Sequence, residues 1–158
     1  MTQDQAMTLA LRYLAFQPRP VVQMQTYLSG KNVDHETIEF VVSRLKADQY
    51  LDDSQYARMF VENRARHNPK SLFALGYELA QKGIASSDIN AALDGYDDEA
   101  LARKCIAKKF HSWQHFDDAK FTKKILSTLQ YRGFNYGICH SVKDHFTAIK
   151  AQVHKEDK

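Results

Sequence analysis

Three six-residue stretches decide how this chain folds: residues 28–33 (LSGKNV), 79–84 (LAQKGI) and 129–134 (LQYRGF). Each has a leucine, then a glycine or asparagine four positions later, then an apolar residue, and the leucines lie 51 and 50 positions apart. Glycine and asparagine adopt positive φ at low cost and commonly end helices, after which an apolar residue packs back on the helix. The stretches therefore predict the same helix end three times.

Apolar residues recur at helical spacing through nearly the whole chain, and strand-type alternation is nowhere sustained. The last three helices are expected over residues 97 to about 110, about 118 to 132 and about 135 to 149. We predict an all-α protein of three tandem three-helix repeats, followed by a polar tail. The expected bounds are residues 1–51, 52–96 and 97–150, with the tail at 151–158.

One three-helix unit of this size leaves much of its apolar face exposed unless a neighbouring unit covers it. We therefore expect the three repeats to stack into an elongated, curved rod. The alternative is a single compact globule of nine helices.

The composition is that of a folded protein, with 44% hydrophobic and 26% charged residues among 158. No apolar run approaches the ~20 residues of a membrane span, and the start of the chain lacks the features of a signal peptide. We expect a cytoplasmic monomer without membrane contact. Two cysteines are too few for a disulfide framework, and Cys105 shares an apolar face with Ala102, Ile106 and Phe110, which predicts a buried, reduced thiol.

The positive charge is concentrated in the last third of the chain. The net charge is +3, and residues 97–158 hold twelve basic against eight acidic side chains. Such local asymmetry attracts phosphate backbones or acidic partner surfaces. We predict a principal contact surface of Lys108, Lys109, Lys120, Lys123 and Lys124. A subsidiary patch contains Arg64, Arg66 and Lys70, and the alternative is a solvated lysine face with no ligand.

Two further groups of residues have two interpretations each. Phe110, Trp113 and Phe116 lie within the basic region and could stack on single-stranded bases, but we favour packing at a helix junction. Lys82 and Arg132 occupy matching positions just before the turn glycines. We favour pairing with the last carbonyls of their own helices over a role in binding.

Catalytic and cofactor motifs are absent from the sequence. There is no phosphate-binding glycine loop, and His111 and His115 lack the further ligands of a zinc site. The aspartate pairs 52–53, 97–98 and 117–118 stand at predicted helix starts, where capping is their simplest role. We expect no enzyme activity, metal or cofactor; a small helical enzyme using Asp52, Asp53 or the histidines is the third interpretation.

The middle repeat contains a distinctive set of residues: YLDD at residues 50–53, Tyr56-Ala57, Phe60, Asn63-Arg64, Glu78-Leu79 and Lys82-Gly83-Ile84. This set resembles the signature of the RecX family of recombination regulators. Leu129 with Arg132-Gly133-Phe134 resembles the C-terminal signature of the same family, and the likeness spans roughly residues 5–148. The first repeat departs from it: residues 20–24 (PVVQM) replace a Ser-x-x-Glu-Leu-type helix start, and Asn32 stands in place of glycine.

The resemblance implies a function without catalytic residues or cofactor. It implies binding to the RecA recombinase filament on single-stranded DNA, with DNA contacted directly or through the filament. The implied effect is mainly inhibitory, on filament extension, ATP hydrolysis, strand exchange and co-protease activity in DNA repair. The runner-up interpretation is a helical-repeat adaptor that binds a protein partner without touching nucleic acid.

Overall fold

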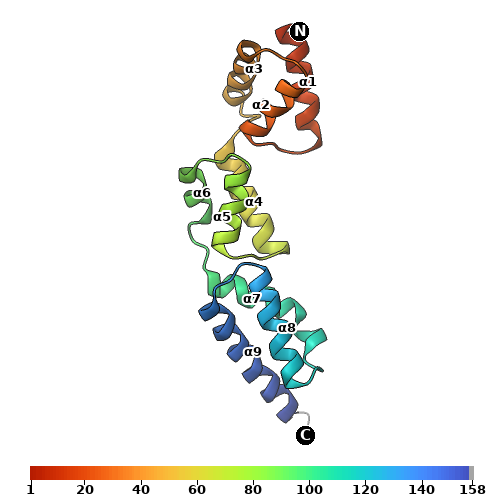
Figure 1. Cartoon of the computed structure of the whole chain (residues 1–158), viewed down its shortest axis with the longest axis vertical. Coiled ribbons are helices and arrows are strands. Elements are labelled where there is room, and N and C mark those ends of the chain that lie inside the picture. Colours follow the sequence, from red (N-terminus) through yellow and green to blue (C-terminus); the bar gives the residue numbers. More distant parts are fainter. Residues whose placement is uncertain (157–158) are drawn as a thin grey trace. The chain divides into compact units, whose positions relative to one another are not determined.

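The computed structural model describes residues 1–156, and this range contains nine α-helices and no β-strand (Figure 1). The prediction of an all-α chain of three consecutive three-helix groups is confirmed. The helices are α1 (Gln3–Phe16), α2 (Val21–Gly30), α3 (His35–Ala47), α4 (Asp53–His67), α5 (Leu72–Gln81), α6 (Ser86–Leu93), α7 (Asp98–Trp113), α8 (Asp118–Tyr131) and α9 (Tyr136–Glu156).

The middle helix of each group ends in the same way. Asn32, Gly83 and Gly133 have positive φ values of 63°, 82° and 88°. The N–H of the next residue donates to the carbonyl of the leucine five positions earlier at 3.1 Å in all three groups. The residues that donate, Val33, Ile84 and Phe134, are at most 5% exposed. The helix end predicted from the three sequence stretches is therefore confirmed.

The aspartate pairs cap helices, as the sequence predicts. The first member of each pair accepts a hydrogen bond from a backbone N–H in the first turn of the helix that follows it. These bonds join Asp52 to Gln55 at 3.0 Å, Asp97 to Ala100 at 2.9 Å and Asp117 to Lys120 at 2.8 Å.

The second members of the first two pairs connect one repeat to the repeat before it. Asp53 accepts a hydrogen bond from the N–H of Val21, the first residue of α2, at 2.9 Å. Asp98 accepts one from the N–H of Leu72, the first residue of α5, at 2.8 Å. Each carboxylate thus satisfies an N–H that has no acceptor within its own helix.

The chain forms two compact units, and the division between them runs through the second repeat. Unit 1 contains residues 1–60 and 77–92, and unit 2 contains residues 61–76 and the chain from residue 93 onward. Each unit contains one junction between consecutive repeats.

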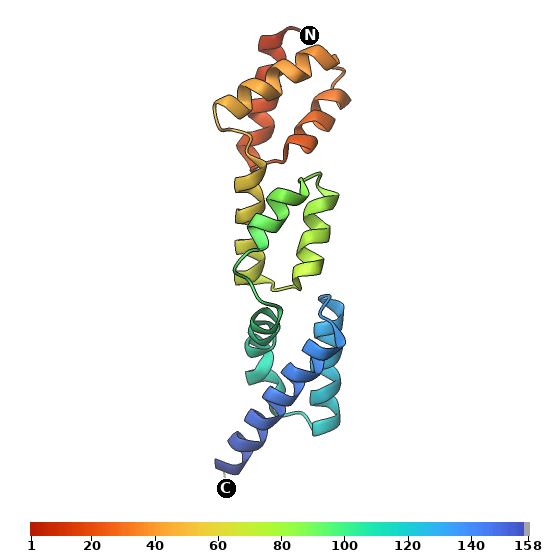
Figure 2. The same ribbon diagram turned by 90° about the vertical axis from the view of Figure 1, so that its left-hand side faces the viewer.

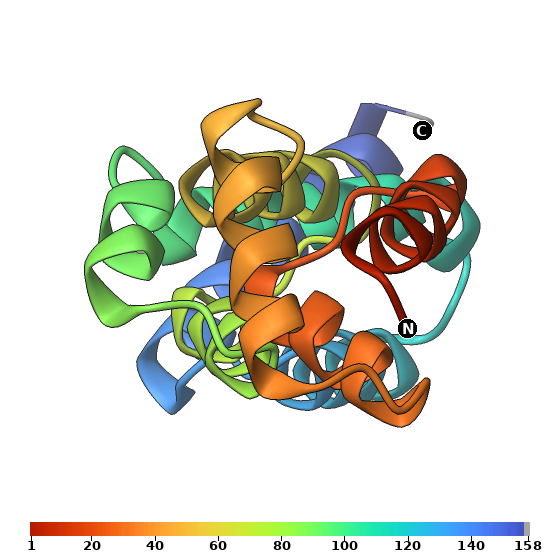
Figure 3. The same cartoon turned by 90° about the horizontal axis from the view of Figure 1, so that it is seen from above.

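Unit 1 is built on the bundle of α1, α2 and α3, which pack on one another (Figure 3). Its core includes Met24, Leu28, Val41 and Leu45, each at most 1% exposed. The turn after α5 contacts this bundle at Gly83. A Cβ atom on Gly83 would lie 2.6 Å from Cγ2 of Val22, so only glycine fits the contact.

Unit 2 is built on α7, α8 and α9, which are drawn at the C-terminal end of the chain in Figure 2. Its fully buried side chains include Ile106, Phe121, Ile125, Leu129 and Val142. The turn after α8 contacts the start of α5. A Cβ atom on Gly133 would lie 2.8 Å from Oγ of Ser71 and 3.0 Å from Cβ of Ala74.

The last helix is longer than the sequence analysis expected. α9 continues to Glu156, seven residues beyond the expected end at Ile149, so residues 151–156 of the expected polar tail are helical. The helix continues because Lys150 is buried and Val153 is half-buried. Residues 157 and 158 of that tail lie outside the described residues.

Candidate nucleic-acid interface

The two compact units differ in charge. Unit 1 holds seven basic and nine acidic side chains, whereas unit 2 holds fifteen basic and ten acidic ones. Of the ten cationic residues that the sequence analysis selected, nine fall in unit 2 and only Lys82 falls in unit 1. The fold therefore collects the principal and subsidiary patches into one compact unit, although about 40 residues separate them in sequence.

The lysines of α8 are open to solvent. Lys120, Lys123 and Lys124 are all exposed, and the Lys120 ammonium lies 4.1 Å from the centre of the Phe116 ring. Within residues 1–156 none of the three forms an ion pair with a carboxylate. Their charge is therefore available to an anionic partner.

The lysines of α7 are arranged differently. Lys108 is exposed, and its ammonium donates a hydrogen bond to the carbonyl of Arg66 at 2.6 Å, which connects α7 to the end of α4. Lys109 is also exposed, and as the next residue on a helix it points about 100° away from Lys108. The two side chains therefore do not share one face of α7.

The subsidiary patch at the end of α4 is partly committed to other contacts. Arg66 is exposed and forms an ion pair with Glu62 at 3.3 Å, a helical pair one turn apart. Arg64 and Lys70 are half-buried. An exposed pair of this kind stabilises a helix only slightly, so Arg66 can exchange its partner at little cost.

Arg132 and Lys82 have structural contacts, but not with their own helix carbonyls. The Arg132 guanidinium donates to Oδ1 of Asn68 and, at 3.1 Å, to the carbonyl of Pro69, both in the segment before α5. The Lys82 ammonium lies 5.9 Å from the centre of the Phe60 ring. The prediction that both side chains pair with the last carbonyls of their own helices was therefore wrong. Arg132 instead contacts the junction between α4 and α5, and Lys82 contacts α4. Sequence position alone does not reveal either contact.

The aromatic residues within the basic region pack inward. Phe110, Trp113 and Phe116 are half-buried and contact the core of unit 2, as favoured from the sequence. Phe110 lies edge-on to Phe121 with ring centres 6.1 Å apart. The exposed aromatic residues of unit 2 are others: Tyr131 at 91%, Phe73 at 80% and Tyr136 at 79%.

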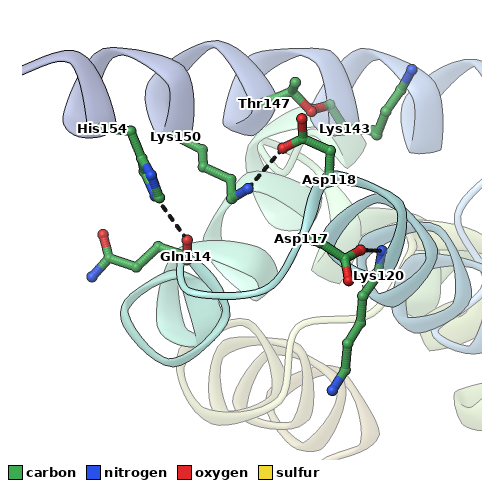
Figure 4. Close-up of polar contacts among 8 residues, drawn as sticks. All are labelled: Gln114, Asp117, Asp118, Lys120, Lys143, Thr147, Lys150 and His154. Atoms are coloured by element: carbon green, nitrogen blue, oxygen red, sulfur yellow. Dashed lines mark hydrogen bonds and ion pairs between the residues drawn. The ribbon is translucent and has the colours of Figure 1, made fainter.

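A polar cluster joins α9 to the start of α8 (Figure 4). Lys150, only 7% exposed, donates to Oδ1 of Asp118 at 2.8 Å, and His154 lies 3.0 Å from the carbonyl of Gln114. The hydrogen bond from Lys150, followed by its positive charge, lowers the pKa of Asp118. Lys120 points away from this pair in Figure 4, so Asp118 does not neutralise its charge.

Both cysteines are free and buried, as expected for Cys105, and burial raises the pKa of each thiol. Residues 1–156 contain no group of three or more histidine, cysteine or acidic side chains placed to hold a metal ion. No helix in the same range combines the length and the apolar character needed to cross a membrane.

Unit 1 has a surface groove of about 520 Å³ that the sequence analysis missed. Its lining includes three exposed apolar side chains, Phe16 at 85%, Tyr50 at 60% and Met59 at 50%. Arg19 also lines it, and its guanidinium lies 4.0 Å from the centre of the Tyr13 ring. The groove forms from α1, the segment after it, the segment before α4 and α4 itself, and only the fold reveals that these lie close together.

The fold and the site together define a class: an all-α protein of three tandem three-helix domains with a basic surface in its second compact unit. Each domain matches a domain of one family. Residues 6–45 match the first three-helix domain of RecX, residues 52–93 the second and residues 97–142 the third. The chain therefore belongs to the RecX family.

Similar proteins agree with this assignment. The chain is 32% identical over 144 residues to the regulatory protein RecX of Oceanobacillus iheyensis, covering 89% of this chain and 53% of that protein. It is 30% identical over 150 residues to the regulatory protein RecX of Streptococcus gordonii, covering 94% of this chain and 58% of that protein. The chain thus spans just over half the length of these curated relatives.

Two solved structures share the fold. A crystal structure of RecX from Lactobacillus salivarius superimposes with a TM-score of 0.76 at 21% identity, covering 92% of this chain and 97% of that one. A crystal structure of regulatory protein RecX gives a TM-score of 0.73 at 27% identity, covering 90% of this chain and 73% of that one.

Proposed function

We propose that this chain regulates the RecA recombinase by binding its filament on single-stranded DNA. The proposed effect is mainly inhibition of filament extension, and with it of ATP hydrolysis, strand exchange and co-protease activity. Membership of the RecX family supports this proposal, since the relatives are named as regulatory proteins. A regulator of this kind needs no catalytic group of its own.

The basic surface of unit 2 is the observation that carries the proposal. Lys120, Lys123 and Lys124 are exposed, project from one helix and form no ion pair within residues 1–156. Unpaired lysines bind phosphates by releasing the counterions that surround nucleic acid. The α8 lysines are therefore proposed to contact the DNA backbone within the filament, and Lys108 and Lys109 of α7 to contribute from the neighbouring helix.

The direct test is a DNA-dependent ATPase assay of the cognate recombinase. Native protein is expected to lower the rate of ATP hydrolysis, and a variant with Lys120, Lys123 and Lys124 all changed to Glu is expected to lose most of this effect. A matched control changes Arg12, Lys46 and Arg58 to Glu, because these residues are exposed and lie in unit 1. The control should inhibit like the native protein.

Two outcomes would contradict the proposal in different ways. If the native protein neither changed ATP hydrolysis nor sedimented with the filament, the proposed function would be wrong. If the α8 variant inhibited as well as the native protein, the contact would lie elsewhere on the chain.

The groove of unit 1 favours a second candidate function, an adaptor that binds a protein partner only. Phe16, Tyr50 and Met59 offer apolar surface of the kind found at protein–protein contacts. Fluorescence anisotropy with single-stranded DNA at low and moderate salt, without recombinase, separates the two candidates. The adaptor predicts no binding at either salt concentration.

A further inference from the structure

One stripe of exposed residues runs along the whole length of α8. Four exposed residues follow one another at intervals of four, three and four positions, the spacing that keeps side chains on one side of a helix: Lys120, Lys124, Ser127 and Tyr131. The opposite face is the buried one, with Phe121, Ile125 and Leu129 at most 1% exposed. The stripe begins with two lysines and ends, about 16 Å further along the helix axis, with an aromatic ring.

The repeat fold does not require an aromatic residue at Tyr131. Its equivalents in the first and second repeats, counted from the leucine that each turn shares, are Gly30 and Gln81. Tyr131 is 91% exposed, more than any other large hydrophobic side chain in residues 1–156. The ring has no stacking partner in that range, so packing does not explain it.

The backbone that carries Tyr131 is held firmly. The next residue is Arg132, whose carbonyl accepts a hydrogen bond from the N–H of Ser71 at 3.1 Å. The Arg132 side chain also donates hydrogen bonds to Asn68 and to the carbonyl of Pro69. Gly133 is in contact with Ser71 and Ala74. A ring presented from a fixed backbone loses little conformational freedom when it binds a flat ligand.

We propose that Tyr131 stacks on a base of single-stranded DNA whose phosphates are bound by Lys120, Lys123 and Lys124. This inference rests on the proposed function and adds how the strand is oriented, with its backbone on the lysines and a base on the end of α8. The combination of a basic track with an exposed aromatic ring is how proteins bind single strands without reading their sequence. It also favours single-stranded over double-stranded DNA, since paired bases do not offer their faces.

The experiment compares two labelled strands of equal length, oligo-dT and the same strand with abasic sites, by fluorescence anisotropy without recombinase. Changing Tyr131 to Ala should weaken oligo-dT binding about 5- to 150-fold, the range for one stacked base. Binding of the abasic strand should not change, nor should the salt dependence of oligo-dT binding. Tyr131→Trp should restore the affinity. Tyr136→Ala is the matched control, because Tyr136 is 79% exposed in the same unit and its ring lies against His140.

The outcomes separate this inference from the proposed function. If the native protein binds oligo-dT and Tyr131→Ala binds it equally well, the stacking role is wrong while the DNA contact stands. An equal loss for the abasic strand, or an equal loss in Tyr136→Ala, would also overturn the stacking role. If the native protein binds neither strand, both the direct DNA contact and the inference fail.

Discussion

Unit 1 and unit 2 share the design of their repeat junction and differ in their surface. In unit 1 the start of α2 packs against Gly83 and donates a hydrogen bond to the Asp53 carboxylate. In unit 2 the start of α5 packs against Gly133 and donates a hydrogen bond to the Asp98 carboxylate in the same way. Yet unit 1 carries more acidic than basic side chains, and unit 2 the reverse. The same junction therefore carries two differently charged surfaces, and we propose nucleic-acid contact for the unit with the added positive charge.

The largest expected effect tests whether the glycine contacts are equivalent. Gly83→Ala and Gly133→Ala should each lower the free energy of unfolding by about 2–4 kcal/mol, because both add a left-handed backbone penalty to a steric clash. Gly95→Ala is the control, since Gly95 has positive φ but open space around it, and should cost about 1–2 kcal/mol. Urea unfolding measures all three.

A rescue sharpens that comparison. Val22→Ala removes the atoms that a Cβ on residue 83 would meet, so it should recover part of the stability that Gly83→Ala removes. A Gly133→Ala variant no less stable than Gly95→Ala would show that the turn after α8 does not dock on α5.

The second prediction contrasts the two cations that precede the turn glycines. Arg132→Met should cost about 1.5–3 kcal/mol, because it removes charge-assisted bonds to Asn68 and Pro69. Lys82→Met should cost less than about 1 kcal/mol, because it removes only a distant contact with the Phe60 ring. A double-mutant cycle that removes the Arg132 and Asn68 side chains singly and together should give a nonzero coupling energy. If the two single losses of stability simply added up, the hydrogen bond between these residues would be contradicted.

The third prediction concerns the carboxylates that cap the preceding repeat. Asp53→Ala and Asp98→Ala should each lower the unfolding free energy by about 1 kcal/mol, because each leaves the first N–H of a helix without its acceptor. The corresponding Asn variants keep an acceptor oxygen and should lose less. A cost at one site with none at the other would show that the two junctions are not built alike.

The smallest effect is the pH dependence of one ion pair in unit 2. Lys150 lowers the pKa of Asp118 below 3.8, so the pair stabilises the folded state fully above that pH. This contribution is lost as the pH falls through the lower folded pKa. The melting temperature of native protein relative to Lys150→Met should therefore decline as the pH drops below about 4. A difference that stays constant down to about pH 2 would contradict the ion pair.

Much of the fold could be predicted from the sequence because its signals are local. The turn residues Asn32, Gly83 and Gly133 and the first aspartate of each pair act within a few residues of their own helix. The contacts that join repeats could not be predicted, since Asp53 and Val21 are 32 residues apart and nothing in their spacing marks them as partners. The end of α9 was placed too early because the burial of Lys150 is set by packing.

The candidate site was predictable as a charge excess but not as a surface. Counting charges along the sequence located the lysines. It could not show that Lys108 donates a hydrogen bond to the Arg66 carbonyl, because that bond forms only where α7 packs beside the end of α4. Exposure decides which aromatic residues are available for stacking, and the sequence analysis did not single out the most exposed of them. Trp113 and Phe116 pack inward, while Tyr131 projects into solvent.

The most direct test of the assignment of nucleic-acid contact to α8 is the salt dependence of single-stranded DNA binding. The slope of log K against log salt changes by about 0.7 for each phosphate of a single strand that a lysine neutralises. The variant with Lys120, Lys123 and Lys124 changed to Glu should therefore show a slope smaller in magnitude by about 2. The control in unit 1, with Arg12, Lys46 and Arg58 changed to Glu, should keep the native slope. Equal slopes for the native protein and the α8 variant would contradict the account.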